Sequence, residues 1–370
     1  MVLVYAVPTR AVKNTSWISR FFKDIIHLDK SSFSLTAGLR AAAFIIAPII
    51  LAFVIQQPAL FLAAIGAIVL TATAKMLPTI PSRILLLACF TDAASFGLGT
   101  LAATTGHLFS PVLLGIAVFA AVAVWANTKW AAVGMYTAII FTIGVGLPGS
   151  SIQSAGLRTL FSLIGMLWAL LGVEIHRFAL SHRRIQLSGS ESAATTTEEQ
   201  QQQQQQQQPS TPRLAALRSA LPIGIVSALG YTVGLVLGLP RDFWTVVPII
   251  LAIRPTSSTL TMTFTSMMII GTIAGALITT GITLETNNYY LLVALLFSFA
   301  VVVFATLGVS ITLTQIFLVP FVIILLNLYY PGQWYLPFIR ILNVAIGAAI
   351  AVAVVYLLSA LSGSRLTFTK

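Results

Sequence analysis

Residues 335–361, YLPFIRILNVAIGAAIAVAVVYLLSAL, decide the fold of this protein. The stretch is longer than the roughly 20 residues that a helix needs to cross about 30 Å of hydrocarbon, and its one charged residue is Arg340. A strand of a membrane β-barrel would alternate polar and apolar residues, and this stretch does not. It therefore predicts a transmembrane helix.

The composition extends this prediction to the whole chain. Of the 370 residues, 58% are hydrophobic and only 8% are charged, and the mean hydropathy is +0.96. A soluble domain carries about 25% charged residues to keep its surface hydrated. Most of the outer surface must therefore face lipid. The net charge is +11, and the basic residues behind it lie in short loops between apolar stretches. There they act as topology signals. The net charge therefore predicts no nucleic-acid partner.

Twelve apolar stretches predict an all-α integral membrane protein, with six spans on either side of residue 200. The predicted spans lie near residues 38–56, 58–74, 84–105, 109–126, 130–147, 157–178, 214–238, 242–254, 258–281, 289–306, 310–330 and 335–361.

Three segments lie outside these spans. Residues 1–37 are predicted to be cytoplasmic and to hold an amphipathic helix over Trp17–Ile26, lying in the membrane interface or on the protein's own face. Residues 181–213 include the run Gln200–Gln208 and predict a disordered cytoplasmic linker. Residues 362–370 form a cytoplasmic tail.

The distribution of Lys and Arg predicts the orientation. Of the 20 Lys and Arg residues, only Arg158, Arg241 and Arg340 fall at predicted outer ends when the N-terminus is inside. Cytoplasmic loops carry an excess of these residues. We therefore expect both termini and the linker to be cytoplasmic, in a multi-pass protein of the plasma membrane.

The two halves share motifs in the same order. Arg158 is followed by Ile164-Gly165, and Arg340 by Ile346-Gly347 at the same spacing. Arg40 and Arg218 likewise open the first and the seventh span, where both are expected to be inner-side anchors. The pattern predicts a duplicated six-span unit, residues 38–180 and 214–361. An even number of spans makes the halves parallel.

The second half carries a resemblance to a known family in three short motifs. They are Leu239-Pro240-Arg241-Asp242-Phe243-Trp244-Thr245, then Arg254-Pro255, then Gly271-Thr272-Ile273-Ala274-Gly275. With the Arg340 helix, they resemble the FUSC family of fusaric acid resistance proteins and aromatic acid exporters. The six-span module is also similar to that of plant aluminium-activated malate channels.

The resemblance covers roughly residues 35–180 and 213–360, and the first half resembles the family more weakly. Two departures stand out. Many members have an arginine where this chain has Met268. The large cytoplasmic domains of the bacterial exporters are replaced here by the glutamine-rich linker.

The candidate substrate site is built around arginines. Because the repeat makes Arg158 and Arg340 equivalent, we expect them to form a cationic constriction that binds carboxylates, since guanidinium can bond a carboxylate through two donors. The alternative is that each extends to the outer interface. Arg254 would add positive charge, and Phe243 and Trp244 would contact an aromatic ring.

Two acidic residues are interpreted differently. Asp92 is isolated in the middle of a span, where a carboxyl group can carry a coupling proton, unless it forms a salt bridge with an arginine. Glu174 lies three residues before Arg177 and predicts a pair at the end of a helix.

The resemblance implies a transporter that exports small organic anions, aromatic carboxylates in particular, and Asp92 adds the expectation of proton coupling. A passive anion channel and a non-transporting membrane scaffold are the alternatives. No motif of an enzyme, a cofactor site or a metal site is present, and the single cysteine, Cys89, has no companion. The expected partners are the organic anion, the lipid bilayer and, for an oligomer, further copies of the chain.

Overall fold

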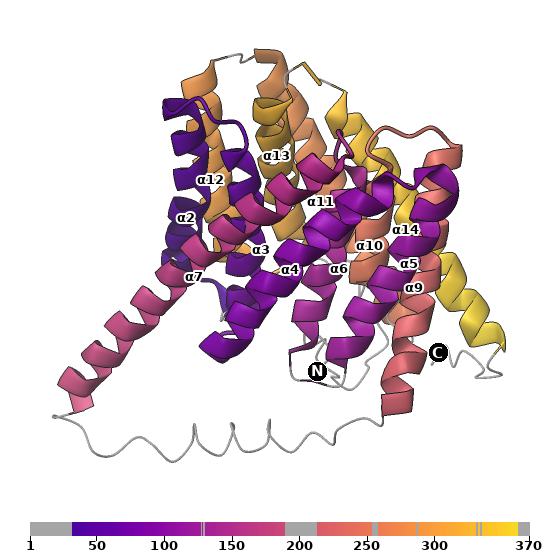
Figure 1. The fold of residues 1–370 in the computed structure, drawn as a ribbon, viewed down its shortest axis with the longest axis horizontal. Coiled ribbons are helices and arrows are strands. Elements are labelled where there is room, and N and C mark those ends of the chain that lie inside the picture. Colours follow the sequence, from indigo (N-terminus) through magenta and orange to yellow (C-terminus); the bar gives the residue numbers. More distant parts are fainter. Residues whose placement is uncertain are drawn as a thin grey trace, which may run out of the picture.

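The computed structural model describes residues 32–126, 128, 130–188, 213–253, 258–285, 288–330, 332–333 and 335–361. Every regular element in this part of the chain is helical, and it contains no strand. The helices form one bundle in which successive elements run in alternating directions (Figure 1). The predicted all-α class is confirmed.

The elements follow the predicted spans in order. In the first half they are α2 (Leu35–Val54), α3 (Leu60–Met76), α4 (Ser82–Ala103), α5 (Gly106–Ala126), α6 (Ala131–Gly146) and α7 (Ile152–Ser188). In the second half they are α9 (Arg213–Val236), the 3-10 helix η2 (Asp242–Thr245) with α10 (Val246–Ala252), α11 (Ser258–Glu285), α12 (Tyr289–Thr306), α13 (Ile311–Tyr329) and α14 (Leu336–Leu361).

The prediction of twelve full spans needs a correction. Within the described residues, nine helices are long and apolar enough to cross a membrane, whereas α3, α6 and the segment Asp242–Ala252 are shorter. That segment is interrupted because η2 has 3-10 geometry and is preceded by Arg241 in a left-handed conformation. Eleven residues of α-helix would span only about 16 Å, roughly half of the hydrocarbon thickness.

Helix α7 extends beyond its predicted limits of 157–178. It begins at Ile152 and continues to Ser188, so it takes up Arg183 and Arg184 at the start of the predicted linker. The rest of that linker, the predicted amphipathic helix at 17–26 and the tail at 362–370 lie outside the described residues.

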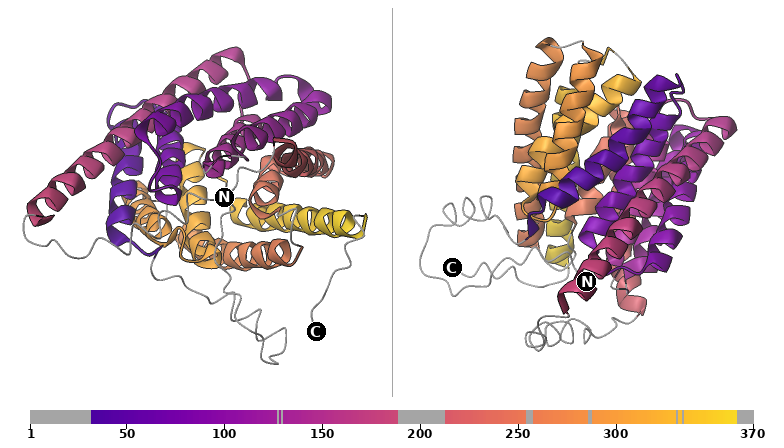
Figure 2. Two further views of the ribbon diagram at one scale, coloured as in Figure 1. Left: turned by 90° about the horizontal axis from the view of Figure 1, so that it is seen from below. Right: turned by 90° about the vertical axis from the view of Figure 1, so that its left-hand side faces the viewer.

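The helices of the two halves pack in corresponding pairs. In the first half α4 packs against α6 and α7, and α3 against α7; in the second half α11 packs against α13 and α14, and α10 against α14. Between the halves, α2 packs against α12 and α5 against α9. The side view in Figure 2 shows the two halves lying next to each other, the first in indigo to magenta and the second in orange to yellow.

Two glycines allow helices to touch without side chains between them. A Cβ atom on Gly165 of α7 would lie 1.8 Å from the carbonyl oxygen of Ala63 on α3, and one on Gly347 of α14 would lie 2.1 Å from that of Thr245 at the end of η2. Small residues at such crossings are typical of helix packing in membranes. The same contact therefore occurs once in each half.

Helices α2 and α9 end with the same C-terminal cap. In α2 the residue after the cap, Gln56, has a φ of 57°, and the N–H of Gln57 donates to Ala52 O at 2.9 Å. In α9 Gly238 has a φ of 62°, and the N–H of Leu239 donates to Gly234 O at 3.0 Å. This is the Schellman arrangement, in which glycine usually holds the left-handed position.

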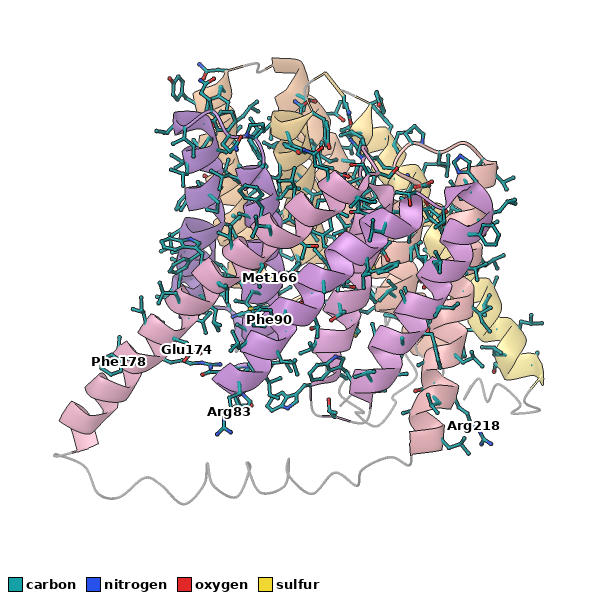
Figure 3. All side chains as sticks on the ribbon, viewed as in Figure 1. Arg83, Phe90, Met166, Glu174, Phe178 and Arg218 are labelled. Atoms are coloured by element: carbon teal, nitrogen blue, oxygen red, sulfur yellow. The ribbon has the colours of Figure 1, made fainter. Side chains whose placement is uncertain are left out.

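The outer surface of the bundle is apolar. Leu108, Ile152 and Val236 are among the many large hydrophobic side chains exposed on it. Phe90 and Phe178, labelled in Figure 3, are two more. Contiguous exposed apolar surface of this extent has to be covered by lipid.

Candidate anion site

Arg340 is the most unusual charged residue of the described chain. It lies in the first turns of α14, and its side chain is only 6% exposed. The guanidinium carbon lies 5.0 Å from the centre of the Trp244 ring, but no hydrogen bond or ion pair joins it to another described residue. A buried guanidinium with free donors is costly unless something pairs with it.

The aromatic residues beside Arg340 are held by the short helix η2. The Asp242 carboxylate accepts a hydrogen bond from Phe243 N at 2.8 Å, and the Thr245 hydroxyl donates to Gly230 O at 2.9 Å. Phe243 and Trp244 are each 2% exposed, with ring centres 5.8 Å apart. The interrupted span thus fixes both rings inside the bundle.

Arg158 is as buried as Arg340, at 4% exposure, but its donors are occupied. One guanidinium nitrogen donates to the Thr100 hydroxyl at 2.9 Å and to Gly144 O at 3.2 Å. The other donates to the carbonyls of Leu147, Pro148 and Gly149. Arg158 therefore neutralises the carbonyl end of α6, where the helix dipole is negative.

Arg340 lies against Trp244, and Arg158 binds a carbonyl near Phe243, but no hydrogen bond joins the two arginines. Phe243 packs against Gly146, where a Cβ atom would lie 1.9 Å from its ring, and Gly146 is two residues beyond the Gly144 carbonyl that binds Arg158. Trp244 lies beneath Arg340. Neither arginine extends to the surface, and Arg254 lies outside the described residues.

Arg241, which the sequence places at an outer end, is joined by tyrosines that the sequence analysis did not assign to a site. Arg241 donates to the Gln333 side chain at 3.0 Å and lies 5.1 Å from the centre of the Tyr330 ring. Tyr330 in turn contacts Tyr329, with ring centres 4.4 Å apart. The consecutive tyrosines next to Pro331 were the available signal, since Tyr collects at membrane interfaces.

Unpaired buried polar atoms concentrate in the second half. Asn343 lies three residues after Arg340; its amide donates to Pro240 O at 3.1 Å, but its carbonyl oxygen has no partner in the described structure. The other side-chain atoms of this kind belong to Ser227, Thr272, Thr312, Gln315 and Asn327. Buried polar atoms without partners mark places where a ligand or water completes the bonding.

Asp92 is buried at the contact between α4 and α6. It is 1% exposed, and its carboxylate accepts a hydrogen bond from the Thr137 hydroxyl. The salt bridge to an arginine, which was the alternative interpretation, is not present among the described residues. The carboxyl group is therefore isolated from every described cation.

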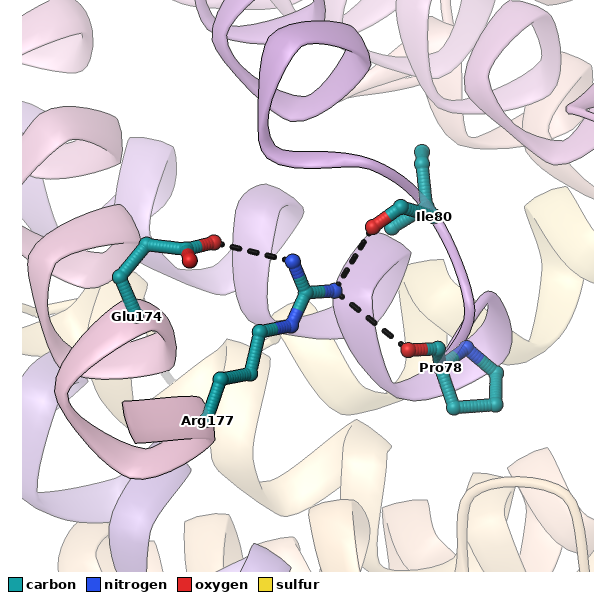
Figure 4. A network of polar contacts seen from close by, with 4 residues as sticks. All are labelled: Pro78, Ile80, Glu174 and Arg177. Carbon is teal, nitrogen blue, oxygen red and sulfur yellow. Dashed lines mark hydrogen bonds and ion pairs between the residues drawn. The ribbon is translucent and has the colours of Figure 1, made fainter. Parts of the chain in front are cut away.

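The predicted pair of Glu174 and Arg177 is confirmed. A guanidinium nitrogen of Arg177 lies 2.9 Å from the Glu174 carboxylate, and another donates to Ile80 O at 2.9 Å and to Pro78 O at 3.4 Å (Figure 4). In the described residues no group of His, Cys, Asp and Glu side chains could hold a metal ion.

Comparison with known families identifies the second half. Residues 228–354 match a family described as fusaric acid resistance protein-like. The matched region runs from α9 into α14 and includes Phe243, Trp244, Arg340 and Asn343. Searches of curated proteins and of solved structures found no match. The chain is thus a multi-span membrane protein with a fusaric acid resistance protein-like domain at residues 228–354.

Proposed function

We propose that this protein exports small organic anions from the cytoplasm, with aromatic carboxylates as its preferred substrates. Proteins with this type of domain are generally transporters rather than enzymes. The observation that carries the proposal is Arg340: a buried guanidinium without a partner, placed over an indole ring, inside the family-matched region.

The chemistry of this site suits an aromatic acid. A guanidinium can donate two parallel hydrogen bonds to a carboxylate, and these bonds are strengthened by charge and by exclusion of water. Phe243 and Trp244 would offer ring contacts to the aromatic part of the substrate. Arg158, and Arg254 by its sequence position, would add positive charge rather than a direct bond.

We further propose that the two halves arose by duplication and are parallel, related by an axis along the membrane normal. The offset between corresponding positions is 182 residues for Arg158 and Arg340, for the contacting glycines Gly165 and Gly347, and for the capping residues Gln56 and Gly238. In such a transporter the substrate path runs between the halves.

Asp92 is the proposed proton carrier. A carboxyl group inside a membrane bundle is costly in its charged form and marks a proton relay by default. Its isolation from cations and its single hydrogen bond to Thr137 support this role. The predicted orientation, with both termini cytoplasmic, would let exported anions leave through the end where Arg158 and Arg340 begin their helices.

A passive anion channel is the second candidate. Its support is the resemblance to malate channels, in which basic residues could select anions without a proton site. The buried Asp92 favours the coupled exporter instead. The non-transporting scaffold would leave the unpaired Arg340 without a role.

Flux through the purified full-length protein in proteoliposomes separates these functions. Labelled 4-hydroxybenzoate and labelled malate are supplied with an imposed pH gradient. Uphill movement of 4-hydroxybenzoate that a protonophore abolishes supports the coupled exporter. Movement that only follows the anion's own gradient supports the channel. No flux of either anion contradicts both, and an R340Q variant that transports normally contradicts the proposed site.

A further inference from the structure

A cationic cavity lies at the other end of the bundle from Arg340. It is a small space of about 20 Å³ lined by α2, α3, α7 and α12, through Ala37, Arg40, Ala41, Thr71, Ala74, Lys75, Val173 and Phe304. A volume of this size holds about one water-sized group. Because Phe304 belongs to the second half, the cavity lies where the two halves meet.

The Arg40 guanidinium has no described protein partner in this cavity. Arg40 is half-buried, and it forms no hydrogen bond or ion pair with any other residue that the structure describes. The other basic side chains around it have partners. Lys75 donates to Ser32 O at 3.0 Å, and Arg177 is paired with Glu174 (Figure 4).

The charges around Arg40 repel it rather than pair with it. Arg177 is within electrostatic reach of Arg40, and Arg40 is within reach of Lys75 and His176. Arg40 of α2 and Lys75 of α3 line the same cavity, whereas Arg177 of α7 is paired with Glu174. Like charges brought together at a partly buried point raise the free energy of the fold unless an anion neutralises them.

Comparison with Arg218 shows that membrane anchoring does not explain this arrangement. Arg218 holds the corresponding position at the start of α9, but its side chain is exposed. Figure 3 shows Arg218 and Arg83 projecting from the same end of the bundle. An anchor needs only access to the interface, as Arg218 has; Arg40 instead faces a cavity shared with Lys75.

We propose that this cavity is a second anion site, which binds an oxyanion, in particular a phosphate group, through Arg40 and Lys75. The guanidinium would donate to one or two phosphate oxygens, and the Lys75 ammonium would supply a point charge. Because the cavity holds only one water-sized group, a single oxygen enters it and the rest of the ligand stays outside. The phosphate comes either from a lipid headgroup or from a soluble molecule.

Thermal unfolding of the full-length protein in lipid nanodiscs tests this site. The reference discs contain phosphatidylcholine, whose choline group neutralises its own phosphate. Inorganic phosphate is the soluble probe in these discs; in a separate arm, the anionic phosphatidylglycerol replaces part of the phosphatidylcholine. We expect phosphate or phosphatidylglycerol to raise the Tm of the wild type and of the matched control R218Q, and to leave the Tm of R40Q unchanged. R40K should keep part of the shift.

The arms also separate this site from the proposed transport site. An R340Q variant should keep the full Tm shift, because Arg340 lies at the other end of the bundle. If R40Q does not fold, K75Q should lose the shift instead. An equal shift in R40Q and R218Q, or no shift of the wild type in either arm, would overturn the second anion site. An Arg40-dependent shift in a protein that transports no anion would reject the transport proposal alone.

Discussion

Arg158 and Arg340 are both buried near the start of a long helix, but their guanidinium groups have opposite surroundings. Arg158 donates to the hydroxyl of Thr100 and to the carbonyls that end α6. Arg340 lies over the face of Trp244 and forms no hydrogen bond or ion pair with another residue that the structure describes. The first arginine completes a network of the protein itself, and the second leaves its donors for a ligand.

This difference predicts opposite effects of the same substitution. R158M leaves buried carbonyls unpaired and should destabilise the protein by roughly 1–3 kcal/mol. R340M removes a buried unpaired charge and should leave the Tm unchanged or raise it, while 4-hydroxybenzoate transport falls roughly tenfold or more. Thermal unfolding and proteoliposome flux of the two variants check this; a larger loss of Tm in R340M than in R158M contradicts it.

Asp92 gives a second prediction at the residue scale. In D92N the amide oxygen can still accept from Thr137, so the fold should persist, but the side chain no longer exchanges a proton. We expect accumulation driven by a pH gradient to be lost while exchange down the anion gradient remains. E174Q, which alters the half-buried pair with Arg177, is the control. Full pH-driven accumulation by D92N would reject the coupling role.

At the scale of helices, the contact between α3 and α7 depends on the absence of a side chain at Gly165. A Cβ atom there would overlap the backbone of Ala63 on α3, whereas a Cβ atom on Gly156, in the same helix, meets nothing within 4 Å. The two glycines therefore differ in what an added methyl group displaces, although both are in α7.

G165A should destabilise the protein by roughly 1–3 kcal/mol, because helix backbones must move apart. G156A should be neutral or stabilising by up to about 1 kcal/mol, since alanine is the better helix former. Tryptophan fluorescence during heating measures both variants in the same membrane mimetic. A G165A variant that melts like G156A would show that α3 and α7 do not touch as described.

Hydropathy predicted the helical segments because, in lipid, the backbone N–H and C=O groups of each segment must form hydrogen bonds within that segment. It placed the ends of α7 poorly, since polar residues such as Arg183 can continue a helix beyond the membrane. It also treated 242–254 as one span, because composition does not register the 3-10 turn that begins at Asp242.

The candidate site was predictable only in part. Sequence position made Arg158 and Arg340 equivalent, and both are buried. Their hydrogen bonding differs because carbonyls around Arg158 come from a loop after α6. The cavity at Arg40 was not predicted, although Lys75 and Arg177 had been assigned to the same end. In lipid, a helix is apolar on its exposed face as well as on its buried face. The apolar pattern therefore does not show which helices pack against each other.

At the scale of the whole molecule, orientation is the property that the inside-positive distribution predicts and that labelling can test. Cys89 is fully buried, so new cysteines can be labelled with little background. Arg218 lies near the start of α9 and Tyr290 at the start of α12, where it is 82% exposed.

We expect an impermeant maleimide to label Y290C on intact cells and R218C only in inside-out vesicles. The physical reason is that positively charged loops stay on the cytoplasmic side during insertion. Labelling of the unmodified protein sets the background from Cys89. The reverse pattern of labelling would invert the orientation and, with it, the direction assigned to transport.

The caps of α2 and α9 suggest how to make this protein easier to handle. The second half places Gly238 at the left-handed position, whereas the first half places Gln56 there, and a side chain in that conformation costs roughly 1–2 kcal/mol. The second half thus shows which residue suits this turn: the glycine at position 238. We expect Q56G, which places glycine at this left-handed position, to raise the Tm. Q57G should not raise the Tm, because φ is not positive at that residue. The higher thermal stability of the Q56G variant would make the protein easier to purify and to crystallise.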